Sequence, residues 1–221
     1  MLKNIKSFYY LKIIFSFLEE KQKLELIKYN KSLQEIINIS LINYKFFSRR
    51  YKEYELNGKG KEYFYNNGLL RFDGEYLNGK RNGKGKEYND AKLIFEGEYL
   101  NGERNGKGKE YYYDNDQFEF EGEYLNGKRN GKGKEYYIDG KLRYEGSYLN
   151  GKRNGKGKEY YIDGKLKFEG EYLNGEKNGK GKEYYKNGEL IFEGEYLYGY
   201  RLKGKYYINE RLEYEGEFFV W

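Results

Sequence analysis

Residues 95–112 read Phe95-Glu-Gly-Glu-Tyr-Leu-Asn-Gly-Glu-Arg-Asn-Gly-Lys-Gly-Lys-Glu-Tyr-Tyr112, and this stretch decides the fold. Side chains of a β-strand point alternately to opposite faces, so Phe95 and Tyr99 share one face with the intervening glycine, and the two glutamates share the other. Residues 101–106 contain two Asn-Gly pairs, which suit the left-handed backbone angles of a tight turn. A second strand then follows from Lys107. The stretch therefore predicts a β-hairpin.

The hairpin pattern recurs along the chain. Seven copies carry an aromatic residue, an acidic residue, a glycine and, two places on, a second aromatic residue. Their glycines stand at positions 74, 97, 122, 146, 170, 194 and 216, so the period is 22 to 25 residues. Such a period is typical of stacked repeats, in which each unit buries its apolar face against its neighbours. We therefore expect residues 51–221 to form seven to eight hairpins in an elongated, open and twisted antiparallel meander.

Glycine recurs on the ring-bearing face of both strands, as at Gly97 and Gly108. Glycine in a strand interior costs about 0.5–1 kcal/mol relative to alanine, because its backbone loses more entropy on folding. Its repeated use indicates that aromatic rings lie directly over the backbone. Successive hairpins are thus expected to stack their rings into a continuous ladder.

The run from Phe120 to Gly133, Phe-Glu-Gly-Glu-Tyr-Leu-Asn-Gly-Lys-Arg-Asn-Gly-Lys-Gly, resembles the MORN repeat. That family's pattern is Tyr-x-Gly-x-(Trp/Tyr)-x-x-Gly-x-x-x-Gly-x-Gly, and the Lys-Glu-Tyr-Tyr that follows Gly-Lys-Gly here is similar to its variant form. The resemblance covers residues 51–221, with atypical units at both ends, as capping repeats would be. It implies a scaffold or interaction protein, with contacts to membranes, to phospholipids or to copies of itself.

Residues 1–50 have a different period. Apolar residues recur at three-to-four spacing, which predicts a small α-helical segment, and the segment carries ten Lys and Arg against four Asp and Glu. Part of it, Leu11-Lys-Ile-Ile-Phe-Ser-Phe-Leu18, resembles an F-box without the usual Leu-Pro. That resemblance implies an adaptor that binds a Skp1-like ubiquitin-ligase subunit. The alternative is a cap packed on the first hairpin. In either case the apolar interface consists of Leu11, Ile14, Phe15 and Leu18.

Catalytic chemistry is not expected. The chain has no histidine and no cysteine, so the commonest general base and the thiolate metal ligands are missing. The glutamate pair at Glu96 and Glu98 recurs in most copies, whereas a catalytic pair should be a singular departure. The glycine-rich segments do not have the spacing of a phosphate-binding loop. We therefore expect a non-enzymatic protein with no cofactor and no metal site.

The basic hairpins are the candidate binding surface. Outside residues 1–50 the chain holds 32 basic and 32 acidic residues, but the repeats spanning residues 122–169 are locally basic. A cationic stripe there would contact an acidic protein or an anionic phospholipid surface; the alternative is a solvated, charge-balanced rim. Nucleic acid is not expected as a partner, because the rings recur at core positions. The candidate residues are Lys128, Arg129, Lys132, Lys152, Arg153 and Lys156.

The longest apolar stretch is residues 8–18, which is shorter than the roughly 20 residues that cross a bilayer as a helix. No small-residue cleavage site follows it, since the next residues are Glu19-Glu-Lys-Gln22. We therefore expect a cytoplasmic protein, with peripheral contact to a membrane as the alternative.

Overall fold

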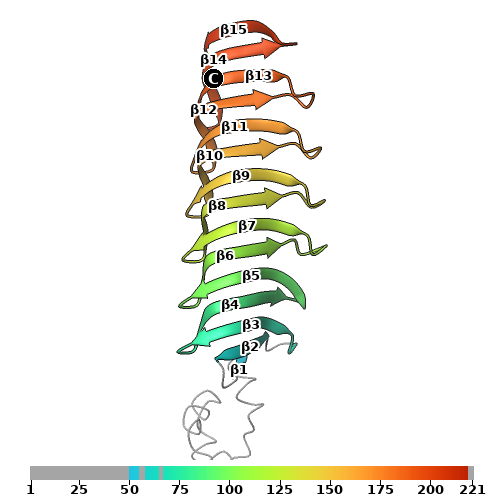
Figure 1. The fold of residues 1–221 in the computed structure, drawn as a ribbon, viewed down its shortest axis with the longest axis vertical. Helices are drawn as coiled ribbons and strands as arrows, with labels where there is room; N and C mark the ends of the chain where they lie inside the picture. Colours follow the sequence, from blue (N-terminus) through green and yellow to red (C-terminus); the bar gives the residue numbers. More distant parts are fainter. Residues whose placement is uncertain (1–49, 55–57, 65–66, 219–221) are drawn as a thin grey trace, which may run out of the picture.

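The computed structural model describes residues 50–54, 58–64 and 67–218. These residues form a single fifteen-stranded sheet, in which the strands lie in the order of the sequence. Each strand pairs antiparallel with the next, so the sheet is a meander of hairpins stacked along one axis (Figure 1). The predicted antiparallel meander is confirmed. The predicted helical segment of residues 1–50, with the F-box-like or capping interface, lies outside the described residues except for Arg50, which begins β1.

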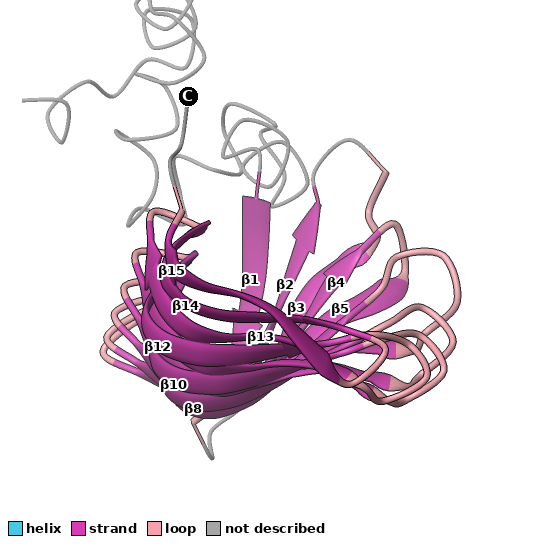
Figure 2. Cartoon of the chain, turned by 90° about the horizontal axis from the view of Figure 1, so that it is seen from above, coloured by secondary structure: helices cyan, strands magenta, loops and turns pink. Residues whose placement is uncertain are grey.

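Most strands are eight to ten residues long and curved, and the sheet twists along its length, as the view along the stack shows (Figure 2). The strands are β1 (Arg50–Tyr54), β2 (Lys59–Phe64), β3 (Leu70–Leu77), β4 (Lys80–Asn89), β5 (Lys92–Leu100), β6 (Glu103–Tyr111), β7 (Phe118–Leu125), β8 (Lys128–Tyr136), β9 (Leu142–Leu149), β10 (Lys152–Tyr160), β11 (Leu166–Leu173), β12 (Glu176–Tyr184), β13 (Leu190–Leu197), β14 (Tyr200–Ile208) and β15 (Arg211–Glu217).

The short turns of the hairpins are two-residue Asn-Gly turns. Between β5 and β6, Asn101 and Gly102 have φ angles of 52° and 99°. Two successive positive φ angles define the type I′ turn, whose twist matches that of the flanking strands. The last of these turns has Tyr198 with a φ of 49° in place of asparagine. Positive φ is uncommon for a bulky residue, so this turn is a less favourable member of the series.

The second Asn-Gly pair of each repeat lies within a strand, and the sequence-based prediction that it belongs to the turn is wrong. Strand β6 begins at Glu103 rather than at Lys107. Tyr99 pairs with Arg104 and Gly97 pairs with Gly108, so β6 has extra residues opposite this part of β5. The excess residues form a β-bulge at Asn105-Gly106, where Gly106 has a φ of 97°. After the bulge, from Gly108 onward, the side chains of β6 again alternate between the two faces in register with β5. A bulge also increases the local twist of the strands.

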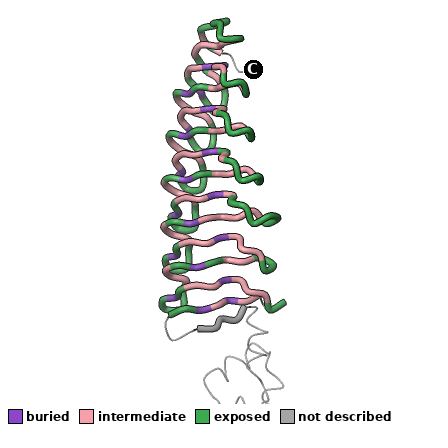
Figure 3. The backbone as a smooth tube through the Cα atoms, turned by 45° about the vertical axis from the view of Figure 1, so that its right-hand side comes forward, coloured by how far each residue is buried: buried purple, intermediate pink, exposed green. Residues whose placement is uncertain are grey.

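The aromatic side chains form the core on one face of the sheet. Phe95 is 0% exposed and Tyr99 is 4% exposed. The ring of Phe95 meets Tyr99 of its own strand and Tyr124 of the next repeat edge to face, at centroid distances of 5.7 and 5.2 Å. The same two contacts recur from Phe72 to the last hairpin, and the buried positions recur along the stack (Figure 3). The predicted ladder of rings is confirmed.

Paired glycines lie beneath the rings. Gly97 and Gly108 are direct partners across β5 and β6. A Cβ atom on Gly97 would stand 2.8 Å from Cζ of Phe95, closer than carbon atoms approach. Any larger residue would therefore displace the ring, and the predicted packing role of these glycines is confirmed.

Candidate functional site

The face opposite the rings carries two rows of charged side chains. The first, which we call the loop-side row, alternates basic and acidic residues on successive paired strands. It consists of Lys61, Asp73, Lys86, Glu96, Lys109, Glu121, Lys134, Glu145, Lys158, Glu169, Lys182, Glu193, Lys205 and Glu215.

The second row lies nearer the Asn-Gly turns, and we call it the turn-side row. It also alternates in charge, except that a serine stands at one acidic position. It consists of Lys59, Glu75, Lys84, Glu98, Lys107, Glu123, Lys132, Ser147, Lys156, Glu171, Lys180, Glu195, Lys203 and Glu217.

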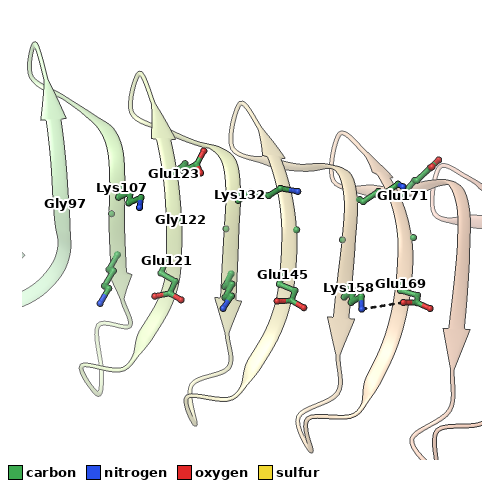
Figure 4. Close-up of a pocket in the computed structure, with 18 of the residues that line it drawn as sticks. Gly97, Lys107, Glu121, Gly122, Glu123, Lys132, Glu145, Lys158, Glu169 and Glu171 are labelled. Atoms are coloured by element: carbon green, nitrogen blue, oxygen red, sulfur yellow. Dashed lines mark ion pairs between the residues drawn. The ribbon is translucent and has the colours of Figure 1, made fainter.

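An open groove runs between the two rows, from Lys59 to Glu215, with a volume of about 1860 Å³. The glycine pairs form its floor, where their backbone faces the groove between the two charged rows, while the rings cover the other side of the same pairs. In Figure 4, Glu121, Glu145 and Glu169 follow one edge of the groove, and Lys107 and Lys132 follow the other. The groove is therefore a long strip of peptide backbone bordered by regularly alternating charges.

The ion pairs along the groove are solvent-exposed. Lys158 and Glu169 lie 3.7 Å apart, with side chains that are 50% and 36% exposed. Exposed pairs of this kind contribute about 0–1 kcal/mol, because water screens them and the side chains lose entropy. The groove charges are thus free to exchange their partners for those of a bound molecule at low cost.

Some groove carboxylates have a second partner. The hydroxyl of Tyr111 donates to Glu96 at 2.7 Å, and this hydrogen bond, helped by the charge of Lys86, holds the pKa of Glu96 below its ordinary value despite partial burial. Equivalent tyrosines donate to Glu121, Glu145 and Glu169. Glu96 therefore remains ionised at neutral pH.

On the aromatic face, the charged residues are held in place by one another. Arg104 lies 3.9 Å above the ring of Phe95 and pairs with Glu87 at 2.8 Å and Glu110 at 3.0 Å. Tyr99 donates to Glu87 at 2.9 Å. Burial alone would raise the pKa of Glu87, but the hydrogen bonds and charges of Arg104 and Tyr99 outweigh it, so that pKa is lowered. These groups stabilise the ladder and are not presented to a ligand.

The predicted cationic stripe is divided between two faces of the sheet, because its residues lie within strands whose side chains alternate in direction. Arg129 and Arg153 lie on the aromatic face, over the rings of Phe120 and Tyr144, and each pairs with glutamates of that face. They belong to the internal ladder rather than to a surface stripe.

The four lysines of the predicted stripe remain accessible but lie at different places. Lys132 and Lys156 line the groove. Lys128 and Lys152 are exposed at the beginning of β8 and β10, next to the Asn-Gly turns. A binding role for these lysines stays a prediction.

The sequence analysis did not predict the two alternating rows or the role of Ser147. The sequence does contain the pattern, because the glutamates of the Phe-Glu-Gly-Glu-Tyr copies and the lysines of Gly-Lys-Gly-Lys stand at fixed positions. Comparing the copies position by position would have shown that Ser147 alone replaces the second acid in the seven copies.

The described part of the chain contains no group of histidine, cysteine, aspartate and glutamate side chains arranged to hold a metal ion. In those same ranges, the structure has no helix of the length and apolarity needed to cross a membrane. The F-box-like residues Leu11, Ile14, Phe15 and Leu18 lie outside the described residues.

A single-layer sheet of tandem hairpins, with a ring ladder on one face and a charged groove on the other, defines a repeat protein of the extended, non-globular class. Sequence comparison identifies the class more closely. The MORN repeat matches residues 50–69, 72–90, 95–117, 120–141, 144–165 and 168–189, which is more than half of the chain. The chain belongs to the MORN-repeat family, and the family resemblance of the sequence is confirmed.

No curated protein matches the sequence significantly. Among solved structures, the chain is similar to the crystal structure of TarM, with 12% identity, 56% of this chain and 23% of that chain covered, and a TM-score of 0.33. A second match is an S. aureus TarM mutant in complex with fondaparinux, alpha-GlcNAc-glycerol and UDP, with 12% identity, coverage of 61% and 26%, and a TM-score of 0.34. The matches span about a quarter of each TarM chain, and similarity this low carries no functional conclusion.

Proposed function

We propose that this protein is a non-enzymatic scaffold that binds a protein partner along the groove between the two charged rows. The observation that supports this proposal is the groove itself, which follows the sheet from Lys59 to Glu215 with alternating, solvent-exposed charges. A long strip of this kind fits an extended polypeptide, whose own charged side chains can exchange with the weak ion pairs at its edges.

The arrangement of the polar groups argues against catalysis. Carboxylates whose pKa is lowered, such as those of Glu87 and Glu135, are bound by arginine and tyrosine on the aromatic face. The carboxylates of the groove recur on successive repeats with the same neighbours. A scaffold requires such repetition, whereas an active site requires one place that differs in reactivity.

The charge pattern favours a protein over a membrane surface. A membrane of anionic lipid would meet about as many carboxylates as ammonium groups in the groove, so the attraction of each lysine would be offset. A polypeptide with both signs of charge can match the alternation. Binding to anionic phospholipid is therefore an alternative outcome of the test.

The test uses two double variants with the same charge change on the same strands. Lys134→Glu with Lys158→Glu reverses two lysines of the groove, and Lys128→Glu with Lys152→Glu reverses two exposed lysines beside the turns. Each variant and the parent protein would be used to capture partners from cell extract, followed by mass spectrometry. We expect a partner that is kept by the turn variant and lost by the groove variant.

Two outcomes would contradict the proposal. The first is a partner that both variants retain equally, which would place binding outside the groove. The second is salt-sensitive sedimentation of the parent protein with phosphatidylserine vesicles that the groove variant loses, since that result would assign the groove to a membrane surface. Thermal melting of both variants checks that the sheet is intact.

A second proposal concerns the N-terminal segment, and it rests on the sequence Ile14-Phe-Ser-Phe-Leu18 alone. If this segment is an F-box, the full chain is an adaptor that joins a Skp1-like subunit to a target held by the repeats. Phe15→Glu should then abolish co-precipitation with a Skp1-like protein while the repeats melt unchanged. A lower melting temperature with unchanged co-precipitation would instead favour the cap.

A further inference from the structure

The turn-side row contains one departure from its alternation, at Ser147. The neighbouring strands pair Lys132 with Ser147 and Lys156 with Glu171, so the local order is Lys-Ser-Lys where every other step is Lys-Glu-Lys. One negative charge is therefore missing from an otherwise balanced part of the groove. The serine is half-buried, and both lysines are exposed.

In other repeats the glutamate at this position has a defined structural partner. The carboxylate of Glu98 accepts a hydrogen bond from the backbone N–H of Lys107 at 3.4 Å, and it occupies the space where a Cβ on the bulge glycine Gly106 would stand. The equivalent hydrogen bonds at Lys84 and Lys180 measure 3.3 and 3.4 Å. The bulge thus forms a small receptor for a carboxylate.

The repeat of Ser147 has the same receptor without the glutamate. The bulge lies between Arg153 and Gly157, at the same place in β10 as in the other second strands. Around Gly155, whose φ is 87°, the nearest atoms to a Cβ position are Cβ and Oγ of Ser147, at 3.5 and 3.8 Å. The space that a carboxylate fills in the other repeats is therefore open here.

Hydrogen-bond donors surround this space. The ammonium group of Lys132 donates to Oγ of Ser147 at 3.0 Å, and the serine hydroxyl keeps its own proton to donate. By analogy with Lys107, we expect the backbone N–H of Lys156 to point into this space, and Lys156 also has an exposed side chain at the groove. Donors that carry a charge make the stronger hydrogen bonds to an oxyanion.

We infer that the space bordered by Lys132, Ser147, Gly155 and Lys156 is a carboxylate-binding site, which takes an acidic side chain of the partner that lies in the groove. The inference rests on the proposed function for the source of the carboxylate. A carboxylate is the ligand because the same backbone already holds a glutamate carboxylate in three other repeats. A bound acidic residue would complete the alternation of the turn-side row.

The site can be tested without the partner, by titrating the ¹⁵N-labelled protein with sodium acetate at constant ionic strength. We expect the amide signal of Lys156 to shift saturably, while the amides of Lys84, Lys107 and Lys180 stay in place because their own glutamates occupy the equivalent space. Ser147→Glu should abolish the shift by filling the site from within. Lys152→Gln makes the same charge change outside the groove and should leave the shift intact.

Three results would overturn the inference. They are a Lys156 shift no larger than those of the other three amides, a shift that survives Ser147→Glu, and a stronger response to inorganic phosphate than to acetate. The last would show that the site prefers a tetrahedral dianion. The titration uses small anions and no partner protein. A negative titration would therefore refute the carboxylate site but not the groove, and a negative capture experiment would refute the groove but not the titration result.

Discussion

Two tyrosines four residues apart provide a stringent test of the ring ladder. Tyr144 is 0% exposed and stands where β3, β5, β7, β11 and β13 have phenylalanine, and its hydroxyl has no hydrogen-bond partner among the described residues. Tyr148 is 4% exposed, and its hydroxyl donates to Oε1 of Glu135 at 2.7 Å. Replacing each tyrosine by phenylalanine removes the same oxygen atom, but the structure predicts opposite effects on stability.

The magnitudes follow from the partners. A buried polar group without a hydrogen bond costs about 1–3 kcal/mol, so Tyr144→Phe should raise the free energy of unfolding by about 1 kcal/mol or more. A hydrogen bond to a charged group contributes about 1.5–3 kcal/mol, so Tyr148→Phe should lower the free energy of unfolding by about 1.5–3 kcal/mol. For a protein of this size, 1 kcal/mol moves the melting temperature by about 2–4 °C.

The measurement is urea denaturation of the full chain followed by circular dichroism, with both single variants compared with the parent protein. A higher midpoint for Tyr144→Phe and a lower midpoint for Tyr148→Phe are expected, at an unchanged slope. Two changes of the same sign would refute the reasoning. A decrease for Tyr144→Phe would show that its hydroxyl has a partner, such as an ordered water molecule beneath the Gly146–Gly157 pair.

Three further outcomes are expected. Phe120→Ala, at a ring that is 0% exposed, should lower the free energy of unfolding by about 3–5 kcal/mol in urea denaturation. Lys152→Ala, beside the exposed turn, should lower it by less than about 0.5 kcal/mol. Equal losses would mean that the buried and exposed faces of the sheet are assigned wrongly. The pKa values of Glu87 and Glu135 are lowered from 4.5, so these carboxylates stabilise the fold above that pH and stop doing so as the pH falls below it. Urea denaturation followed by circular dichroism at decreasing pH should therefore show a falling unfolding midpoint. Burial, followed by the hydrogen bond to Glu145, raises the pKa of Tyr160 from 10.0 to about 12, so its contribution to stability should be lost between those pH values. The tyrosinate absorbance of Tyr160, measured as the difference between the parent protein and Tyr160→Phe, should appear above pH 10.

The sequence predicts the ladder because its two determinants are local. Alternation puts Phe95 and Tyr99 on the same face, and the spacing of the copies sets the stacking. The bulge was missed because Asn-Gly suits both a type I′ turn and a strand bulge, and composition alone does not separate the two. This error affected the candidate site, because β10 already begins at Lys152 and its alternation puts Arg153 on the aromatic face and Lys156 in the groove, although both belong to the same basic run.

A groove built from identical repeats does not by itself fix where along its length a partner binds, and the single irregular position, Ser147, can do so. A partner with alternating charges could bind an unbroken row in many registers, because a shift by two strands replaces every lysine by a lysine and every glutamate by a glutamate. The ion pairs would then contribute to affinity without fixing position. Ser147 is different, because an acidic side chain placed there gains the donors of Lys132 and Lys156, whereas at any other acidic position of the row it meets the protein's own carboxylate. Attraction at one position and repulsion at the others is how a specific register is selected. In the proposed complex, the groove therefore supplies the length of the contact, and the Ser147 site supplies its register.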